Sequence, residues 1–149
     1  MNNINQATYQ PTKAYRLASF VTFAVGGCGF LLGLWNAELL LSEKGFYLAI
    51  FMLGLFSAVT LQKTIREKEE GININKTFTA ICWSSFIAAI SMLVLGLYNA
   101  EMMLSEKGFY GMAFVVSLFA AITIQKNTRD IGGEVAQAAG EHTDESLTE

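Results

Sequence analysis

The hydrophobic residues of this chain are gathered in four long runs that are separated by polar segments. Two of the runs, residues 17–34 and 77–98, contain no Asp, Glu, Lys, Arg or His. At about 1.5 Å per residue, each forms a helix long enough to cross a hydrocarbon core of about 30 Å. The other two, residues 46–61 and 109–124, are shorter, but apolar residues shortly before each can lengthen the helix or lie at the membrane interface. The pattern therefore predicts an all-α polytopic membrane protein with four transmembrane helices.

The polar segment after the first run occurs a second time after the third run. Residues 33–47 read GLWNAELLLSEKGFY and residues 96–110 read GLYNAEMMLSEKGFY, at an offset of 63 positions. The helix exits match as well, because QKxxR at 62–66 returns at 125–129. The chain is therefore a tandem duplication. Since each copy contains an even number of spans, both insert in the same orientation, which predicts two parallel two-helix repeats related by a pseudo-twofold axis along the membrane normal.

The duplication also predicts how the chain is divided. Its five parts are a polar leader over residues 1–14, a first two-helix unit over 15–70, a cytoplasmic linker over 71–76, a second two-helix unit over 77–131 and an acidic tail over 132–149. The tail has almost no large apolar residue and cannot bury a core, so it is predicted to be solvated and disordered.

Cleavage of the N-terminal segment is not expected. Residues 1–12 carry no basic residue and the first apolar run has membrane length, so the first helix is predicted to be retained. Residues 25–28 (VGGC) loosely resemble a bacterial lipoprotein cleavage box, but the sequence stays apolar up to Leu34, where a lipoprotein would have a polar tether. Cys28 and Cys82 differ in predicted depth by roughly 12 Å, which is too far for a disulfide, and both are interpreted as small packing residues.

The basic residues are segregated. Only Lys44 and Lys107 fall on one side of the four spans, and eight fall on the other: Lys13, Arg16, Lys63, Arg66, Lys68, Lys76, Lys126 and Arg129. Because cytoplasmic loops carry the excess of Lys and Arg, both termini and the central loop are predicted to be cytoplasmic and the two repeated turns to face outward. Four of these side chains are expected to anchor the protein at lipid phosphates, although they are too sparse for a polybasic recognition site: Lys63, Arg66, Lys126 and Arg129.

The two repeated turns carry a polar cluster: Asn36, Glu38, Glu43, Lys44, Asn99, Glu101, Glu106 and Lys107. One interpretation is that the two copies bring four carboxylates and two ammonium groups around a common axis. Such a cluster would be a site for a cation, a proton or a polar solute, because ionisable groups close to lipid are costly unless they are paired or used.

The favoured interpretation of the same residues is a capped turn. Asn36 can end the first helix in a left-handed conformation, Ser42 can cap the second helix, and Glu43 favours the positive end of that helix. Glu38 and Glu101 are explained least by capping, because each lies between an Asn-Ala pair and an apolar triplet at the membrane interface.

Two further patterns concern packing. Gly29 and Gly33 form a small-xxx-small motif that allows close approach of another helix, which belongs either to this chain or to a second subunit. Aromatic residues near the turns predict an interfacial belt: Trp35, Phe46, Tyr47, Tyr98, Phe109 and Tyr110.

Several classes of site are excluded. The chain has no Walker-type phosphate loop, no glycine-rich dinucleotide turn after a strand, and no Cys or His cluster with metal-ligand spacing. The only histidine, His142, lies in the acidic tail, so a bis-histidine haem site is excluded within one chain. No metal, cofactor or nucleic acid is therefore expected. The predicted partners are the lipid bilayer and either a second copy of the chain or another membrane protein.

The repeated motifs resemble a known family. The motifs GLWNAE at 33–38, LSEKGFY at 41–47 and QK at 62–63, together with their second copies, are similar to the YiaA/YiaB two-helix-domain family of small bacterial inner-membrane proteins. The resemblance covers residues 15–131 and implies a bacterial cytoplasmic membrane location. The family carries no established biochemical activity, so the resemblance implies no mechanism.

The function expected from these observations is non-enzymatic. We expect a structural or interaction protein that packs with itself or with another membrane protein and exposes its outer turns. The alternative is an oligomeric permeation protein for small ions or solutes that uses Glu38 and Glu101, because four helices alone would need partners to enclose a path. An enzyme is the least favoured class.

Overall fold

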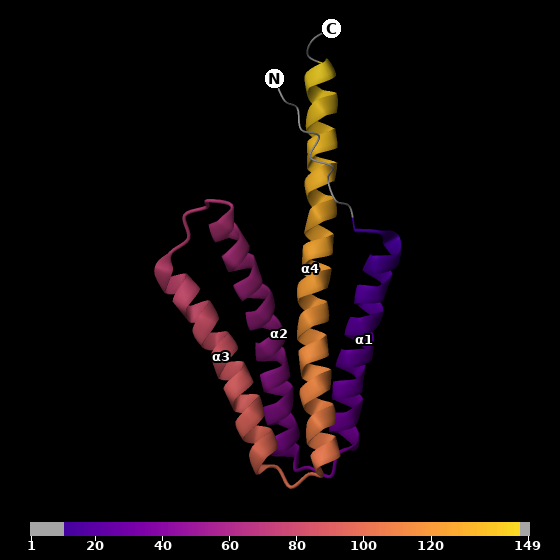
Figure 1. The fold of residues 1–149 in the computed structure, drawn as a ribbon, viewed down its shortest axis with the longest axis vertical. Coiled ribbons are helices and arrows are strands. Elements are labelled where there is room, and N and C mark those ends of the chain that lie inside the picture. The colour runs from indigo at the N-terminus through magenta and orange to yellow at the C-terminus, as the bar shows by residue number, and fades with distance from the viewer. Residues whose placement is uncertain (1–10, 147–149) are drawn as a thin grey trace.

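The computed structural model of the chain describes residues 11–146, with side chains described up to residue 130. It consists of four α-helices joined by short connections (Figure 1): α1 Lys13–Asn36, α2 Leu41–Glu69, α3 Lys76–Asn99 and α4 Leu104–Ser146. All four are long and apolar enough to cross a membrane, α4 over Leu104–Asp130. This confirms the predicted all-α architecture with four membrane-length helices.

Local chemistry explains the helix ends at the end of the bundle where α1 and α3 begin, which we call the basic end. The Thr12 side chain accepts a hydrogen bond from the Tyr15 backbone N–H at 3.2 Å, and the Asn75 side chain accepts one from Thr77 N–H at 2.9 Å. Both side chains thus occupy the N-cap position of a helix. Beyond the end of α2, Gly71 has a φ of 79°, a conformation that glycine adopts at no steric cost.

The helix α4 continues through most of the segment that the sequence predicts to be a disordered tail. Its backbone is helical up to Ser146, while residues 147–149 lie outside the described part of the chain. Ala and Glu recur in this segment and have high helix propensity, so a helix already started in a transmembrane span can propagate into it.

The four helices are paired across the two sequence units. α1 packs mainly against α4 and α2 mainly against α3, while α2 and α4 meet at the centre of the bundle (Figure 1). The two helices of one unit make few contacts with each other. The connections permit this arrangement because Ala37 and Leu40 have extended backbone, and four extended residues span up to roughly 14 Å. The repeat unit of the sequence is therefore not a packed helical hairpin.

Aromatic rings fill the centre of the bundle. Phe30 stacks on Phe51 with centroids 4.5 Å apart, and Phe51 meets Phe114 edge-on at 6.2 Å. Phe30, Phe114 and Ile50 are fully buried. Phe51 and Phe114 are the same position in the two copies, 63 residues apart, and equivalent residues meet at a twofold axis. The contact therefore places the pseudo-twofold axis between α2 and α4.

A buried polar contact ties each helix pair together near the basic end. In the α1–α4 pair, Asn127 Nδ2 donates to Ser19 Oγ at 3.3 Å. In the α2–α3 pair, Thr64 Oγ1 lies 3.7 Å from Cys82 Sγ. The offset of 63 relates Ser19 to Cys82 and Thr64 to Asn127, so the two contacts are one feature of the repeat with different side chains. Both cysteines are free thiols, and Cys28, which the sequence suggests is a packing residue, is exposed instead.

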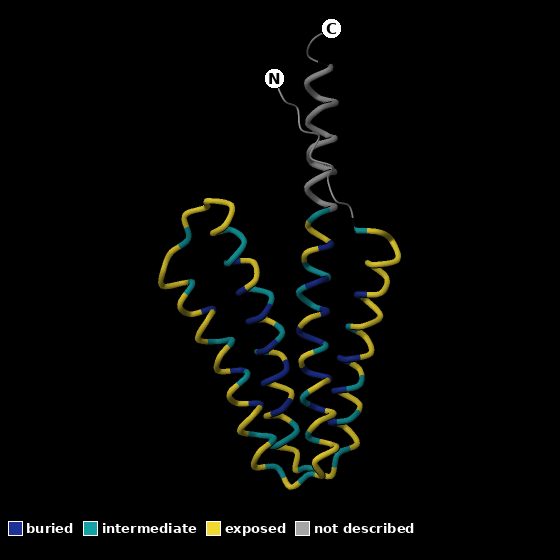
Figure 2. The backbone as a smooth tube through the Cα atoms, viewed as in Figure 1, coloured by how far each residue is buried: buried dark blue, intermediate teal, exposed yellow. Residues whose placement is uncertain are grey.

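The outward faces of the helices are apolar and exposed (Figure 2). The helices differ greatly in burial. In the most apolar stretch of each helix, 17% of α3 is buried within the bundle, compared with 39% of α2 and of α4. In a bilayer such faces contact lipid tails or other transmembrane helices. The bundle therefore leaves its largest unpartnered surface on α3.

Candidate functional site at the two turns

The first turn is held by three side chains that stabilise helix ends. Lys44 Nζ donates to the Trp35 carbonyl oxygen at 2.8 Å, and Asn36 Nδ2 donates to the Leu32 carbonyl at 2.8 Å. At the start of α2, Glu43 Oε2 accepts from the Leu40 N–H at 2.8 Å. The ammonium group thus meets the negative end of α1 and the carboxylate meets the positive end of α2.

The second turn repeats these contacts. Lys107 Nζ donates to the Tyr98 carbonyl at 3.3 Å, Asn99 Nδ2 donates to the Leu95 carbonyl at 2.8 Å, and Glu106 Oε2 accepts from Met103 N–H at 2.8 Å. Six of the eight residues predicted as an outer polar cluster therefore make helix-end hydrogen bonds.

The capping differs in detail from the prediction. No described residue other than glycine has a positive φ, so Asn36 does not end α1 in a left-handed conformation. Ser42 is already inside α2, which begins at Leu41. The longer side chain of Glu43 reaches back to the free N–H at Leu40 instead, which removes the need for a serine cap.

Glu38 and Glu101 occupy the turns themselves and are exposed. Among the described residues, neither has a hydrogen-bond or ion-pair partner within the chain. Glu43 and Glu106 point into two different pockets, so the four carboxylates do not converge on one site.

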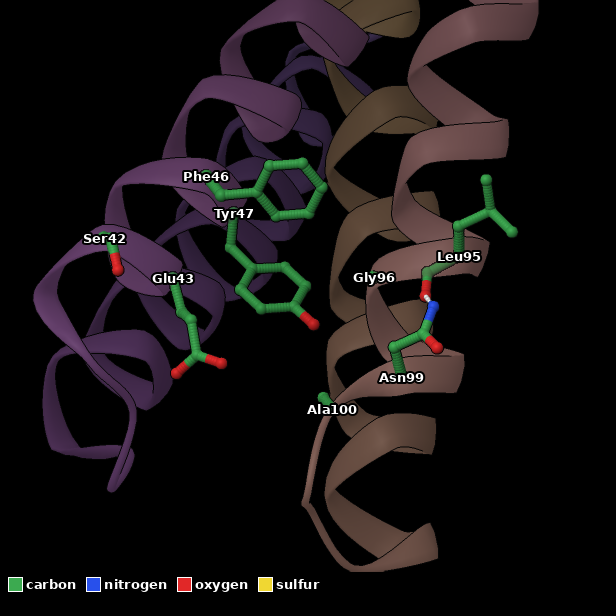
Figure 3. A pocket seen from close by; sticks show the side chains of 8 residues that line it. All are labelled: Ser42, Glu43, Phe46, Tyr47, Leu95, Gly96, Asn99 and Ala100. Carbon is green, nitrogen blue, oxygen red and sulfur yellow. Dashed lines mark hydrogen bonds between the residues drawn. The ribbon is translucent and has the colours of Figure 1, made fainter.

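Two equivalent pockets lie beside the turns. The first, the α2–α3 pocket, has a volume of about 400 Å³ (Figure 3) and is lined by Ser42, Glu43, Phe46, Tyr47, Leu95, Gly96, Asn99 and Ala100. The second, the α1–α4 pocket, has a volume of about 330 Å³ and is lined by Gly33, Asn36, Ala37, Ser105, Glu106, Phe109 and Tyr110. Each residue of the second set is the copy of a residue in the first at the 63-residue offset. Each pocket thus combines the start of the second helix of one unit with the end of the first helix of the other.

Tyr47 and Tyr110 differ in burial from the other aromatic residues of the predicted interfacial belt. Trp35 and Tyr98 are exposed, but Tyr47 and Tyr110 are only 4% and 5% exposed. A helical pattern could have indicated this, because Tyr47 lies three, four and seven residues before the buried positions 50, 51 and 54. Figure 3 shows the Tyr47 hydroxyl directed between Glu43 and the end of α3.

Comparison with known proteins identifies the repeated unit. The family model described as the yiaA/B two helix domain matches the chain twice, over residues 15–67 and 78–130. The chain belongs to the YiaA/YiaB two-helix-domain family. It is 49% identical to inner membrane protein YiaA of Escherichia coli over 126 residues, which cover 85% of this chain and 86% of the relative. It is 30% identical to inner membrane protein YiaB of the same organism over 112 residues, which cover 75% of this chain and 96% of the relative.

A third relative matches over a shorter length. The uncharacterized membrane protein YubF of Bacillus subtilis is 38% identical over 60 residues, which cover 40% of this chain and 69% of the relative. No solved structure matches the chain. The predicted family resemblance is thus confirmed, and with four membrane-length helices this YiaA/YiaB family member is a multi-pass inner-membrane protein.

The glycines of α1 contact the other repeat of this YiaA/YiaB protein. A Cβ built on Gly33 would lie 2.8 Å from Phe109 Cε1, and one on Gly29 would lie 3.7 Å from the same ring. In the other pair, a Cβ on Gly96 would lie 2.8 Å from Phe46 Cε1. The partner of the small-xxx-small motif is therefore α4 of the same chain.

Three of the four predicted lipid-anchoring side chains have carboxylate partners. Lys63 Nζ lies 3.5 Å from Glu67, and Arg66 Nε lies 3.8 Å from Glu70. Arg129, which lies in α4, also pairs with Glu70. Because Glu70 pairs with both arginines, it links the end of α2 to Arg129 of α4. The fourth, Lys126, lines a small pocket of about 320 Å³ together with Asn127 and Asp130. Anchoring of these side chains at lipid phosphates stays a prediction.

The described residues of this family member contain no group of three or more His, Cys, Asp or Glu side chains close enough to hold a metal ion.

Proposed function

We propose that this YiaA/YiaB protein is a non-enzymatic structural or interaction protein of the inner membrane, which packs through its lateral apolar surface with a second copy or with another membrane protein. The proposal rests on the observation that most polar side chains at the turns serve to hold the fold together. Six of the eight polar residues at the turns stabilise helix ends, and fully buried aromatic rings occupy the centre between the helices. The chain thus offers a rigid scaffold with an exposed apolar flank.

The unequal burial of the helices supports a lateral role. α3 has the smallest buried share of the four spans, and Ile87 on this helix is 58% exposed whereas Ala89, two residues further, is fully buried. Helix association in membranes depends on packing and small-residue contacts, which a helix face of this kind can provide to a neighbour.

Photo-crosslinking from α3 tests the proposal. A photoreactive amino acid at Ile87 in the membrane of intact cells should give a discrete adduct, either a doubled mass or a second protein identified by mass spectrometry. The same group at Ala89 is the matched control and should crosslink only within the chain, because that position is fully buried in the bundle. Adducts to lipid alone at Ile87 and at other exposed α3 positions would contradict the interaction role.

We also propose that both termini and the 70–75 connection face the cytoplasm. The proposal is supported by the excess of Lys and Arg at that end of the bundle. Single cysteines at Ala37, Ala100 and Gly71 can be placed in a background without Cys28 and Cys82. An impermeant thiol reagent applied to spheroplasts should label the two turns and leave position 71 unlabelled. Labelling of only one turn would contradict the four-span topology.

A further inference from the structure

Each turn pocket is lined by a largely buried tyrosine whose hydroxyl group opens into the pocket. Tyr47 is 4% exposed and Tyr110 is 5% exposed, and both line their pockets. Within the part of the chain whose side chains are described, neither hydroxyl takes part in a hydrogen bond. A largely buried tyrosine usually directs its hydroxyl group to a hydrogen-bond partner. Since no described residue supplies one, each hydroxyl group is available to a molecule that enters the pocket.

The other polar atoms of the pocket indicate what that ligand offers. Glu43 uses Oε2 to accept from Leu40 N–H and keeps its second carboxylate oxygen free. Asn99 uses Nδ2 to donate to Leu95, which leaves its amide oxygen as an acceptor. The set is therefore a negative charge, an amide oxygen and a phenol oxygen, with the ring of Phe46 beside them. Such a set favours a positively charged hydrogen-bond donor and disfavours an anion.

The two lysine side chains of the turns do not donate hydrogen bonds to these acceptor oxygens. Lys44 donates to the Trp35 carbonyl and Lys107 to the Tyr98 carbonyl, and neither lysine lines either of the two turn pockets. Among the described residues, neither Glu43 nor Glu106 has an ion pair within 4.0 Å. The carboxylates are thus left to an external cation.

The same arrangement occurs twice in one chain. Glu106, Tyr110 and Asn36 of the α1–α4 pocket are the copies of Glu43, Tyr47 and Asn99 at the 63-residue offset. Asn36 also uses Nδ2 within its helix and keeps its amide oxygen free. The pseudo-twofold axis therefore generates two sites of the same chemistry.

The position of the pockets indicates the source of the cation. Both lie at the ends of membrane-length helices, at the level where lipid headgroups begin. Leu32 and Leu95, one helical turn deeper than Asn36 and Asn99, are 63% and 61% exposed and continue each pocket into an apolar outer face. A molecule with an ammonium group and an acyl chain fits both parts.

We propose that each turn pocket binds a primary ammonium group, and that its source is the headgroup of an amine-bearing phospholipid such as phosphatidylethanolamine. The ammonium group donates to the free oxygen of Glu43 or Glu106 and to the hydroxyl oxygen of Tyr47 or Tyr110. The acyl chains then lie along the exposed faces of α3 and α1. This proposal does not rest on the lateral interaction role proposed above, because the ammonium group binds at the turns.

Native mass spectrometry of the full chain in detergent tests this site. The protein is titrated with phosphatidylethanolamine, phosphatidylcholine and phosphatidylglycerol, and separately with free ethanolamine. We expect up to two phosphatidylethanolamine molecules per chain. Phosphatidylcholine should bind about tenfold more weakly, because its quaternary ammonium group has no N–H donor. Phosphatidylglycerol should bind more weakly still, because it brings negative charge next to the carboxylates.

Three double variants locate the binding. Glu43→Gln with Glu106→Gln keeps the acceptor for the helix N–H but removes the charge, and should weaken phosphatidylethanolamine binding about tenfold. Tyr47→Phe with Tyr110→Phe removes only the hydroxyl groups and should weaken binding severalfold. Glu38→Gln with Glu101→Gln is the matched control, because it removes two carboxylates of the same turns that do not line the pockets, and should leave binding unchanged.

The outcomes separate the possibilities. Equal binding of all three lipids, or equal weakening by the pocket and control variants, would overturn the proposal. Binding of free ethanolamine as tight as that of the lipid would keep the ammonium site and assign it to a soluble amine. Thermal unfolding is recorded for every variant. If the glutamate variant fails to fold, the tyrosine variant tests whether the pockets bind the lipid, because the tyrosine substitutions leave both helix caps in place.

Discussion

The Tyr47 ring of α2 stacks on the Tyr110 ring of α4, with centroids 6.4 Å apart and an interplanar angle of 19°. The two tyrosines are the same position in the two copies of the repeat, 63 residues apart. The chain therefore meets its own duplicate across a pseudo-twofold axis, as two identical subunits do in an isologous dimer. This relationship explains why the two pockets, the two turns and the two buried polar contacts come in equivalent pairs.

The crosswise pairing of helices predicts that the two halves assemble after separation. Residues 1–71 and 72–149, produced as two chains by a break in the exposed connection between α2 and α3, should co-purify in detergent through a tag on one half. Each half alone should aggregate or be degraded, because its two helices make few contacts with each other. A monomeric, stable half would contradict this.

Gly54 lies where a side chain has no room. A Cβ at this position would overlap the ring of Phe114 and approach Leu118. We expect Gly54→Ala to lower the free energy of unfolding by about 1–3 kcal/mol, as overpacked cores do. Phe114→Leu should recover part of the loss, since it removes the overlapping ring. Chemical denaturation in detergent micelles measures both variants.

Gly108 provides the matched control for that experiment. A Cβ at Gly108 of α4 would meet nothing within 4 Å. Gly108→Ala should therefore raise the stability by roughly 0.5–1 kcal/mol through the better helix propensity of alanine. Equal effects of the two substitutions would mean that Gly54 is not a packing position.

Gly33 should matter for folding and not for the number of subunits. Gly33→Leu places a large side chain against Phe109 and Tyr110 of the same chain, so it should cost about 1–3 kcal/mol while leaving the oligomer mass in detergent unchanged. Light scattering with subtraction of the detergent mass measures the oligomer. A change of mass without a loss of stability would instead assign the groove of α1 to a second subunit.

The two buried polar contacts should be interchangeable. Ser19→Cys with Asn127→Thr copies the α2–α3 contact into the α1–α4 pair, where Thr at position 127 can bond the carbonyl four residues earlier, as Thr64 bonds that of Thr60 at 2.8 Å. The double variant should stay within about 1 kcal/mol of the native protein. Asn127→Ala should cost about 1–2 kcal/mol, because it leaves a small cavity and no bond. A double variant less stable than Asn127→Ala would show that the contacts are not equivalent.

Liposomes that contain the purified protein should show no protein-dependent cation flux. The aromatic rings of Phe30 and Phe114 are fully buried at the centre of the bundle, and Glu38 and Glu101 are exposed in the turns. Glu38→Gln with Glu101→Gln should leave the baseline unchanged in a fluorescent cation assay. Carboxylates that line a path select cations by charge, so a native flux abolished by this pair would support the permeation alternative.

Several levels of this structure follow from the sequence by itself. Runs without charge predict membrane spans because an unpaired charge is expensive in hydrocarbon, and repetition of the 33–47 segment shows the duplication directly. The sequence also indicates that Glu43 serves the start of a helix, since capping depends on contacts within a few residues. These features are local or compositional, so they need no knowledge of which helices meet.

The tertiary structure decided which surfaces are shared. Crosswise pairing and hairpin pairing would bury similar apolar faces, and an extended turn of four residues reaches either neighbour, so no local pattern distinguishes them. Tyr47 shows the consequence, because an aromatic ring next to a turn suits an interfacial belt equally well until its counterpart, Tyr110, is placed against it. The pockets likewise join α2 with α3 and α1 with α4, and the polar residues that the two helices contribute to one pocket lie more than 50 positions apart in the chain. Only the packing of one repeat on the other brings them together.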